Sequence, residues 1–118
     1  MKYVFVALLI LNFLAEAMAA TALIGGPEGI AAAGSGGQWS MHYGFAVIAI
    51  ASAGLWVWPV RRELAAVTAV LGILTVFHFS VLASLAMAGD QAAGVVIHTV
   101  LGVLSALCLL QRRAITDS

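Results

Sequence analysis

Charged side chains are scarce in this sequence of 118 residues: five are basic and five are acidic, together 8% of the chain. A soluble domain keeps about 25% charged residues to solvate its surface, so the composition excludes an ordinary soluble domain. Hydrophobic residues make up 64% of the chain, and most lie in runs of about 20, the length that crosses a bilayer as a helix. The formal net charge is zero and no basic cluster exceeds an arginine pair. Nucleic acid is therefore not an expected partner; the lipid bilayer is.

Cysteine and the common catalytic motifs are also nearly absent. Cys108 is the only cysteine, which excludes an intrachain disulfide and a cysteine-based metal motif, so we expect it to pack as a small apolar residue. The sequence offers no Ser-His-Asp set, and the glycine-rich stretch 34–37 does not lie between a strand and a helix as a nucleotide-binding loop requires. We expect no enzyme activity of the chain alone, while membership of a membrane enzyme complex stays open.

Four apolar segments predict an all-α fold, a four-transmembrane-helix bundle that forms a single domain over residues 1–118. A loop rich in glycine and proline separates the first two helices, and Asp90 is a suitable N-cap for the last one. The first apolar run continues past the small-residue pattern at 17–19, which favours a retained helix over a cleavable signal peptide. The expected helices cover residues 3–24, 39–58, 63–88 and 91–111, with the outer loop at 25–38.

The basic residues predict the topology. They lie only at the N-terminus, in the second loop and at the C-terminus: Lys2, Arg61, Arg62, Arg112 and Arg113. With four spans these three places share one side of the membrane, and short basic segments stay cytoplasmic. We therefore expect cytoplasmic N- and C-termini in a multi-pass protein of the bacterial inner (plasma) membrane.

Four titratable residues lie inside the expected spans, one on each helix: Glu16, His42, His78 and His98. Such residues are costly in a bilayer and are functional candidates. At about 1.5 Å per residue from the outer helix ends, their depths are roughly 5 Å for His42, 10 Å for His98, 12 Å for Glu16 and 15 Å for His78. All four fall in the outer half and can converge on one site. The competing interpretation is structural, because an intramembrane histidine also joins two helices by a hydrogen bond.

Small residues indicate which helix faces pack against protein. His98 belongs to a stripe spaced by four residues, and His42 belongs to another; small side chains at this spacing allow helices to approach closely. We expect both stripes to face the bundle interior. Their small residues are Gly94, Gly102 and Ala106 beside His98, and Ala46, Ala49 and Ala53 beside His42.

Metal or haem binding is one class of function for the four residues. Imidazoles and a carboxylate are ordinary ligands of zinc, copper and iron, although no recognised metal spacing occurs. His98 followed by Gly102 resembles the His-x-x-x-Gly arrangement of small cytochromes b. That resemblance implies haem b with His42 as the second axial ligand, and three histidines limit the chain to one haem. The cofactor therefore stays open between a transition metal and haem b.

Two further resemblances point to other classes. Leu14-Ala15-Glu16 in the first helix resembles the small multidrug resistance exporters, which implies that Glu16 binds a proton and a cation in turn, but that family's aromatic residues do not align in the second and third helices. The overall layout, with Trp-Pro-x-Arg-Arg-x-Leu-Ala-Ala at 58–66, resembles small DoxX-like four-helix membrane proteins. No catalytic motif comes with that likeness. We expect a non-catalytic accessory or structural subunit of a larger membrane complex, with other membrane subunits as partners; the alternative is a single-haem electron-transfer protein.

Overall fold

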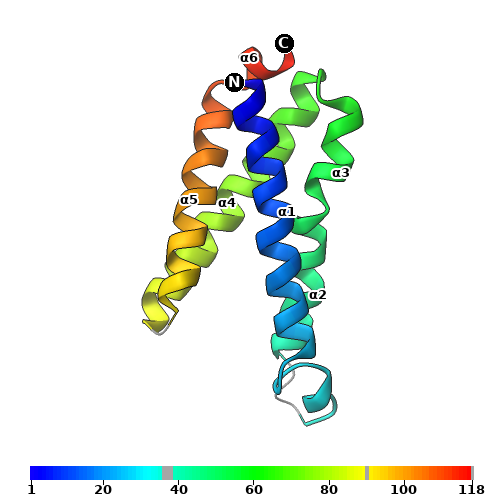
Figure 1. Ribbon diagram of the computed structural model, residues 1–118, viewed down its shortest axis with the longest axis vertical. Helices are drawn as coiled ribbons and strands as arrows, with labels where there is room; N and C mark the ends of the chain where they lie inside the picture. The colour runs from blue at the N-terminus through cyan, green and yellow to red at the C-terminus, as the bar shows by residue number, and fades with distance from the viewer. Residues whose placement is uncertain (36–38, 90, 118) are drawn as a thin grey trace. The chain divides into compact units, whose positions relative to one another are not determined.

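A computed structural model describes residues 1–35, 39–89 and 91–117, and all regular structure within these ranges is helical (Figure 1). The long helices are α1 (Lys2–Gly25), α2 (Trp39–Ala51), α4 (Leu64–Ala88) and α5 (Ala92–Leu110), and the short ones are η1 (Ile30–Ala32), α3 (Ala53–Val57), η2 (Trp58–Val60) and α6 (Arg112–Thr116). Four segments are long and apolar enough to cross a membrane: Lys2–Ala32, Trp39–Val60, Leu64–Ala88 and Ala92–Leu110. The predicted all-α fold with four potential spans is confirmed. Asp90, the expected N-cap, lies outside the described residues.

The chain, expected to be one domain, divides into two compact units. The α1/α2 unit covers Ile10–Gly54 and holds most of α1, the first loop and α2. The α4/α5 unit covers Met1–Leu9 and Leu55–Ser118, and so holds the first turns of α1 together with α4, α5 and α6. Each unit is described below by itself.

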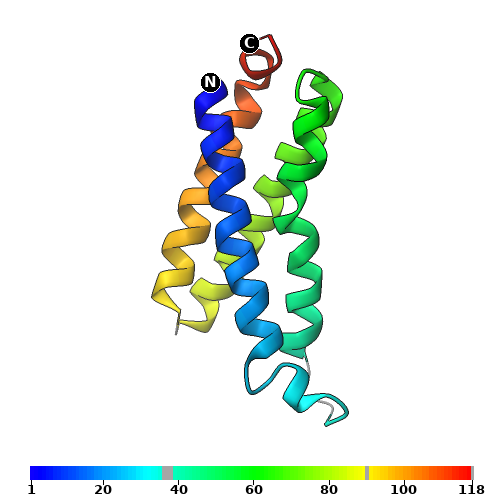
Figure 2. The same cartoon turned by 45° about the vertical axis from the view of Figure 1, so that its right-hand side comes forward.

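In the α4/α5 unit, α4 packs against α5 (Figure 2). The short helix α6 contacts both of them. Gly89 ends α4 with a positive φ of 76°, and its N–H donates to the Leu85 carbonyl, as in a left-handed helix cap. Gly102 of α5 lies against Phe79 of α4, where an added Cβ would come within 3.3 Å of the ring. The His98 stripe therefore lies where the two helices approach each other.

Both helices bury one stripe of residues spaced by three and four, which is the spacing of a single helix face. On α4 the buried residues are Val67, Leu71, Leu74 and His78. On α5 they are His98, Leu101, Gly102, Ser105 and Cys108. Each stripe thus carries a histidine at its end nearest the Gly89 turn.

In the α1/α2 unit, the contact between α1 and α2 corrects the expected packing of the second helix. α2 buries Gly44, Val47 and Ala51. An added Cβ on Gly44 would come 2.7 Å from Cγ1 of Ile24 and 3.0 Å from Cβ of Leu23, so α1 fits only against a glycine there. In the stripe expected to pack, Ala46 and Ala49 are exposed and Ala53 is half-buried. Spacing identifies faces on which helices can approach; the missing Cβ of Gly44 decides which one is used.

The second span, expected as one helix over 39–58, is interrupted between α2 and α3. Ser52 donates its Oγ hydrogen to the Ala49 carbonyl at 2.8 Å, and Asn12 of α1 donates from Nδ2 to the Ile50 carbonyl at 2.9 Å. In a regular helix the Ile50 carbonyl would accept the Gly54 N–H. Serine and glycine together are a common cause of sharp helix bends. Hydropathy does not reveal such a break, because the residues around it are apolar or small and compatible with a span.

Candidate functional site

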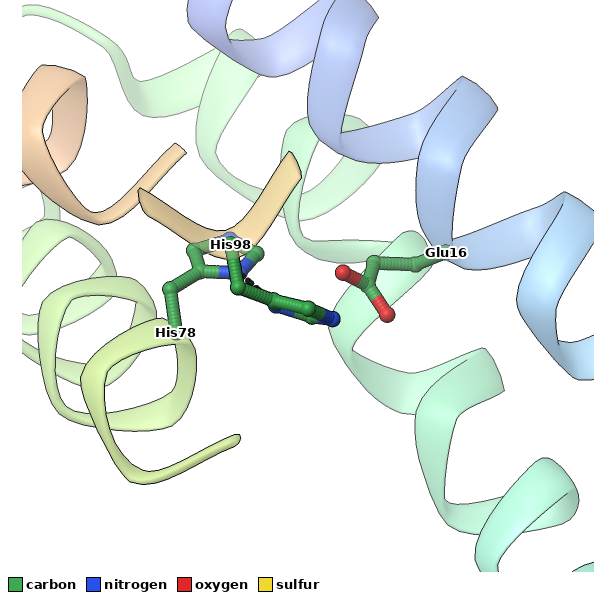
Figure 3. A group of neighbouring side chains, drawn as sticks. All are labelled: Glu16, His78 and His98. Atoms are coloured by element: carbon green, nitrogen blue, oxygen red, sulfur yellow. Dashed lines mark hydrogen bonds between the residues drawn. The ribbon is translucent and has the colours of Figure 1, made fainter. Parts of the chain in front are cut away.

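The polar centre of the α4/α5 unit is a pair of histidines. His78 of α4 is fully buried and His98 of α5 is 8% exposed. Their Nδ1 atoms lie 3.0 Å apart and their ring centroids 5.3 Å apart. Figure 3 shows the two rings reaching toward each other from neighbouring helices, with the contact drawn as a dashed line. We call this contact the histidine pair.

The turn at Gly89 explains why these two residues meet. His78 lies eleven residues before Gly89 and His98 lies nine residues after it. In two antiparallel helices joined by a short turn, residues at similar distances from the turn reach the same level. At about 1.5 Å per residue both lie roughly 14 to 17 Å from the turn. Because each also lies on the buried stripe of its helix, the rings face each other across the interface.

The surroundings of the histidine pair are apolar and aromatic. The Phe77 ring meets His78 edge-on at 5.2 Å and His98 at 6.1 Å between centroids. Buried polar groups need hydrogen-bond partners, and the Nδ1 contact provides one for each ring. A hydrogen bond between two ring nitrogens requires one to donate and the other to accept, so at least one ring is neutral. The contact therefore links the tautomers of the two residues.

The Nδ1 separation bears on which groups the pair can bind. Two imidazole nitrogens that bind one tetrahedral zinc at about 2.0–2.1 Å lie roughly 3.3 Å from each other. Two axial ligands on opposite sides of an iron at about 2.0 Å lie roughly 4 Å apart, with a flat macrocycle between them. The observed 3.0 Å is close to the first arrangement and leaves no space for a porphyrin. The histidine pair is therefore suited to a single small ion.

Glu16 belongs to the α1/α2 unit, where it extends from α1 (Figure 3). It is 1% exposed and shares the buried face of its helix with Asn12 and Ala20. Asn12 lies four residues before it and binds the α2 backbone, so this face of α1 carries two buried polar residues in successive turns. A buried carboxylate in a span is costly, which keeps Glu16 a functional candidate.

His42 differs from the other two histidines. It is exposed at the start of α2, and its ring lies edge-on to Trp39 with 6.0 Å between centroids. Aromatic residues at such positions are typical of the membrane–water interface. His42 therefore does not belong to a buried site, and the expectation that its face turns inward is wrong because α2 buries the face of Gly44 instead.

Two further polar residues are buried but were not among the candidate site residues predicted from the sequence. Asn12 and Ser105 are both fully buried; Asn12 joins α1 to α2, and Ser105 donates to the Leu101 carbonyl at 2.7 Å within α5. The signal was available for Asn12, since an amide inside an apolar run must find an acceptor. A serine bonds its own helix, and nothing in its spacing reveals burial.

Comparisons with known proteins found no match, so the site is interpreted from its geometry alone. The DoxX-like resemblance stays a prediction, since no protein-family model matches the chain and no curated protein or solved structure is significantly similar to it.

Proposed function

We propose that this chain is a multi-pass membrane protein that holds a transition-metal ion at His78 and His98 and works as a non-catalytic accessory subunit of a membrane complex. The observation that carries the metal proposal is the histidine pair itself: two rings inside apolar helices, with Nδ1 atoms 3.0 Å apart. Four potential spans account for most of the described residues, which suits a function carried out within the membrane.

Metal binding at both Nδ1 atoms requires one change of tautomer. The ring that donates from Nδ1 in the hydrogen-bonded pair must carry its proton on Nε2 when Nδ1 binds the metal. The separation then has to widen by a few tenths of an ångström, to roughly 3.3 Å, and the rings have to turn so that both Nδ1 lone pairs point at the ion. Neutral imidazoles suit zinc, copper, nickel and cobalt better than magnesium or calcium, which prefer oxygen ligands. The proposed ion is therefore a divalent transition-metal ion such as zinc.

The proposed ion needs a further ligand that carries negative charge. A divalent ion bound by two neutral rings brings two positive charges into hydrocarbon, and a carboxylate is the group that neutralises part of that charge. Glu16 is the buried carboxylate that the chain offers as a candidate for this role.

The remaining parts of the proposal concern location and partners. The five basic residues favour cytoplasmic termini and an inner-membrane location. Alanine-lined faces such as Ala46 and Ala49, exposed in the single chain, are suited to close contact with helices of other subunits. Purification from the native membrane in a mild detergent tests the subunit proposal: co-purifying membrane proteins at fixed stoichiometry support it, and a monodisperse single chain contradicts it.

Metal stoichiometry tests the site. Purified protein is dialysed against zinc, washed with a weak chelator and analysed for bound metal. We expect about one zinc per chain for the wild type, and a loss of most of it in His78→Ala and in His98→Ala. His42→Ala is the matched control, because His42 is exposed and outside the pair. Equal zinc content in all four proteins, with unchanged helicity by circular dichroism, would rule out the histidine pair as the site.

A further inference from the structure

The basic residues gather at one end of the α4/α5 unit, opposite the Gly89 turn. All five belong to this unit. Lys2 lies in the first turn of α1, Arg61 and Arg62 lie directly before α4, and Arg112 and Arg113 begin α6. Figures 1 and 2 show the N-terminus, the C-terminus and the chain entering α4 at one end of the bundle. Two arginine pairs separated by 50 residues in sequence thus share one end of the unit.

The arginines of α6 are held in place by packing. α6 contacts α4 as well as α5, and its Ile115 is only 4% exposed. Arg112 is half-buried and donates from Nη1 to the Leu109 carbonyl at 2.8 Å. The second arginine pair is therefore part of the folded unit and not of a loose tail.

Arg61 is oriented in a similar way. Its Nη1 donates to the Trp58 carbonyl at 2.9 Å, and its Cζ lies 4.4 Å from the centre of the Trp58 ring. A guanidinium stacked on an aromatic ring retains planar N–H groups for two-point binding of phosphate. Trp56, Trp58 and Tyr3 are exposed at the same end, and such aromatic side chains are typical of the level of lipid headgroups.

We propose that this end binds the headgroup phosphate of an anionic phospholipid, with Arg61 and Arg112 as its principal ligands. These two half-buried arginines lie where the apolar helices end, which is the depth of a lipid phosphate and not of a freely soluble anion. Only two acidic residues, Glu63 and Asp117, lie in the neighbouring described segments, so positive charge predominates. This inference does not depend on the metal proposal.

The test uses delipidated full-length protein in neutral detergent. Thermal unfolding and native mass spectrometry are recorded with added phosphatidylglycerol, phosphatidylcholine or inorganic phosphate. We expect phosphatidylglycerol to be retained and to raise the unfolding temperature, whereas phosphatidylcholine and inorganic phosphate have little effect. Equal effects of the two lipids, or stabilisation by inorganic phosphate alone, would overturn the proposal.

A charge-matched pair of variants separates a defined site from general attraction. Arg61→Gln/Arg112→Gln should weaken phosphatidylglycerol binding at least about tenfold more than Arg62→Gln/Arg113→Gln does. The second variant removes the same charge, but from exposed positions whose side chains are expected to make fewer oriented hydrogen bonds to the phosphate. Arg61→Lys/Arg112→Lys serves if the glutamine variant does not fold, and should still weaken binding severalfold because lysine cannot bind in two-point fashion. Equal losses in the two glutamine variants would show only diffuse attraction and overturn the assignment.

Discussion

At the scale of single residues, the contact between His78 and His98 has two consequences. It satisfies a nitrogen on each of two buried rings, and it places two metal-binding atoms within reach of one ion. In membrane proteins, hydrogen bonds between side chains on different helices contribute about 0.6 kcal/mol on average and up to about 1.7 kcal/mol. Such a bond alone is a modest stabilising contact, so stability and metal binding are separable measurements.

A double-mutant cycle measures the contact without metal. Because each ring is the other's Nδ1 partner, His78→Ala and His98→Ala should be non-additive, with a coupling of about 0.6 to 1.7 kcal/mol. The free energy of unfolding in mixed micelles, measured with a strong chelator present, gives the value. The cycle of His42→Ala with His98→Ala is the control and should be additive within about 0.3–0.5 kcal/mol. Additivity in both cycles would mean that the rings do not interact.

At the scale of helices, hydropathy and charge were sufficient to locate α1, α4 and α5. Their bounds, Lys2–Gly25, Leu64–Ala88 and Ala92–Leu110, lie within one residue of the predicted ones, because uninterrupted apolar runs end at glycines, charges or polar residues. The second span differs: beside its break at Ser52, an amide from α1 binds the Ile50 carbonyl. Contacts between distant residues of this kind are not encoded in local periodicity.

The same limit applies to helix faces. Both the Ala46 stripe and the Gly44 position satisfy the small-residue rule, and only the geometry beside Ile24 shows that Gly44 is the contact. In the candidate site, the residue types were identifiable because titratable groups are rare inside spans. His78 and His98 meet because they lie at similar distances from the Gly89 turn. His42 is exposed because of the rotation of α2 about its axis.

Substitution of Gly44 tests the close approach of α1 and α2. Gly44→Ala places a methyl group 2.7 Å from Ile24 Cγ1, so we expect a loss of about 1–3 kcal/mol from overpacking. Gly72→Ala on α4 is the matched control, because an added Cβ meets nothing within 4 Å there. Alanine is the better helix former, so that variant should be neutral or more stable by up to about 1 kcal/mol. Similar unfolding free energies for the two variants would contradict the packing described for α2.

At the scale of the whole molecule, the four apolar segments indicate a multi-pass membrane protein, and the basic residues all lie outside these segments or at their ends. The proposed metal site and the proposed lipid site lie toward opposite ends of the α4/α5 unit. The first would face the outer half of the bilayer and the second the cytoplasmic surface, provided that the termini are cytoplasmic.

Cysteine labelling tests that orientation. In a Cys108→Ala background, Ser35→Cys should react in intact cells with a thiol reagent that cannot cross the membrane, because Ser35 lies in the exposed loop after α1. Asp117→Cys, which follows α6, should react only after the cells are permeabilised. The opposite pattern would place the termini outside and would contradict the positive-inside assignment.

The most direct test of the metal proposal is zinc K-edge X-ray absorption on zinc-loaded protein in detergent. The account predicts two imidazole ligands with zinc–nitrogen distances of about 2.0–2.1 Å and at least one oxygen ligand. His98→Ala should lose one imidazole. A spectrum without imidazole scattering, or one unchanged in His98→Ala, would contradict the account and leave the histidine pair as a structural contact between α4 and α5.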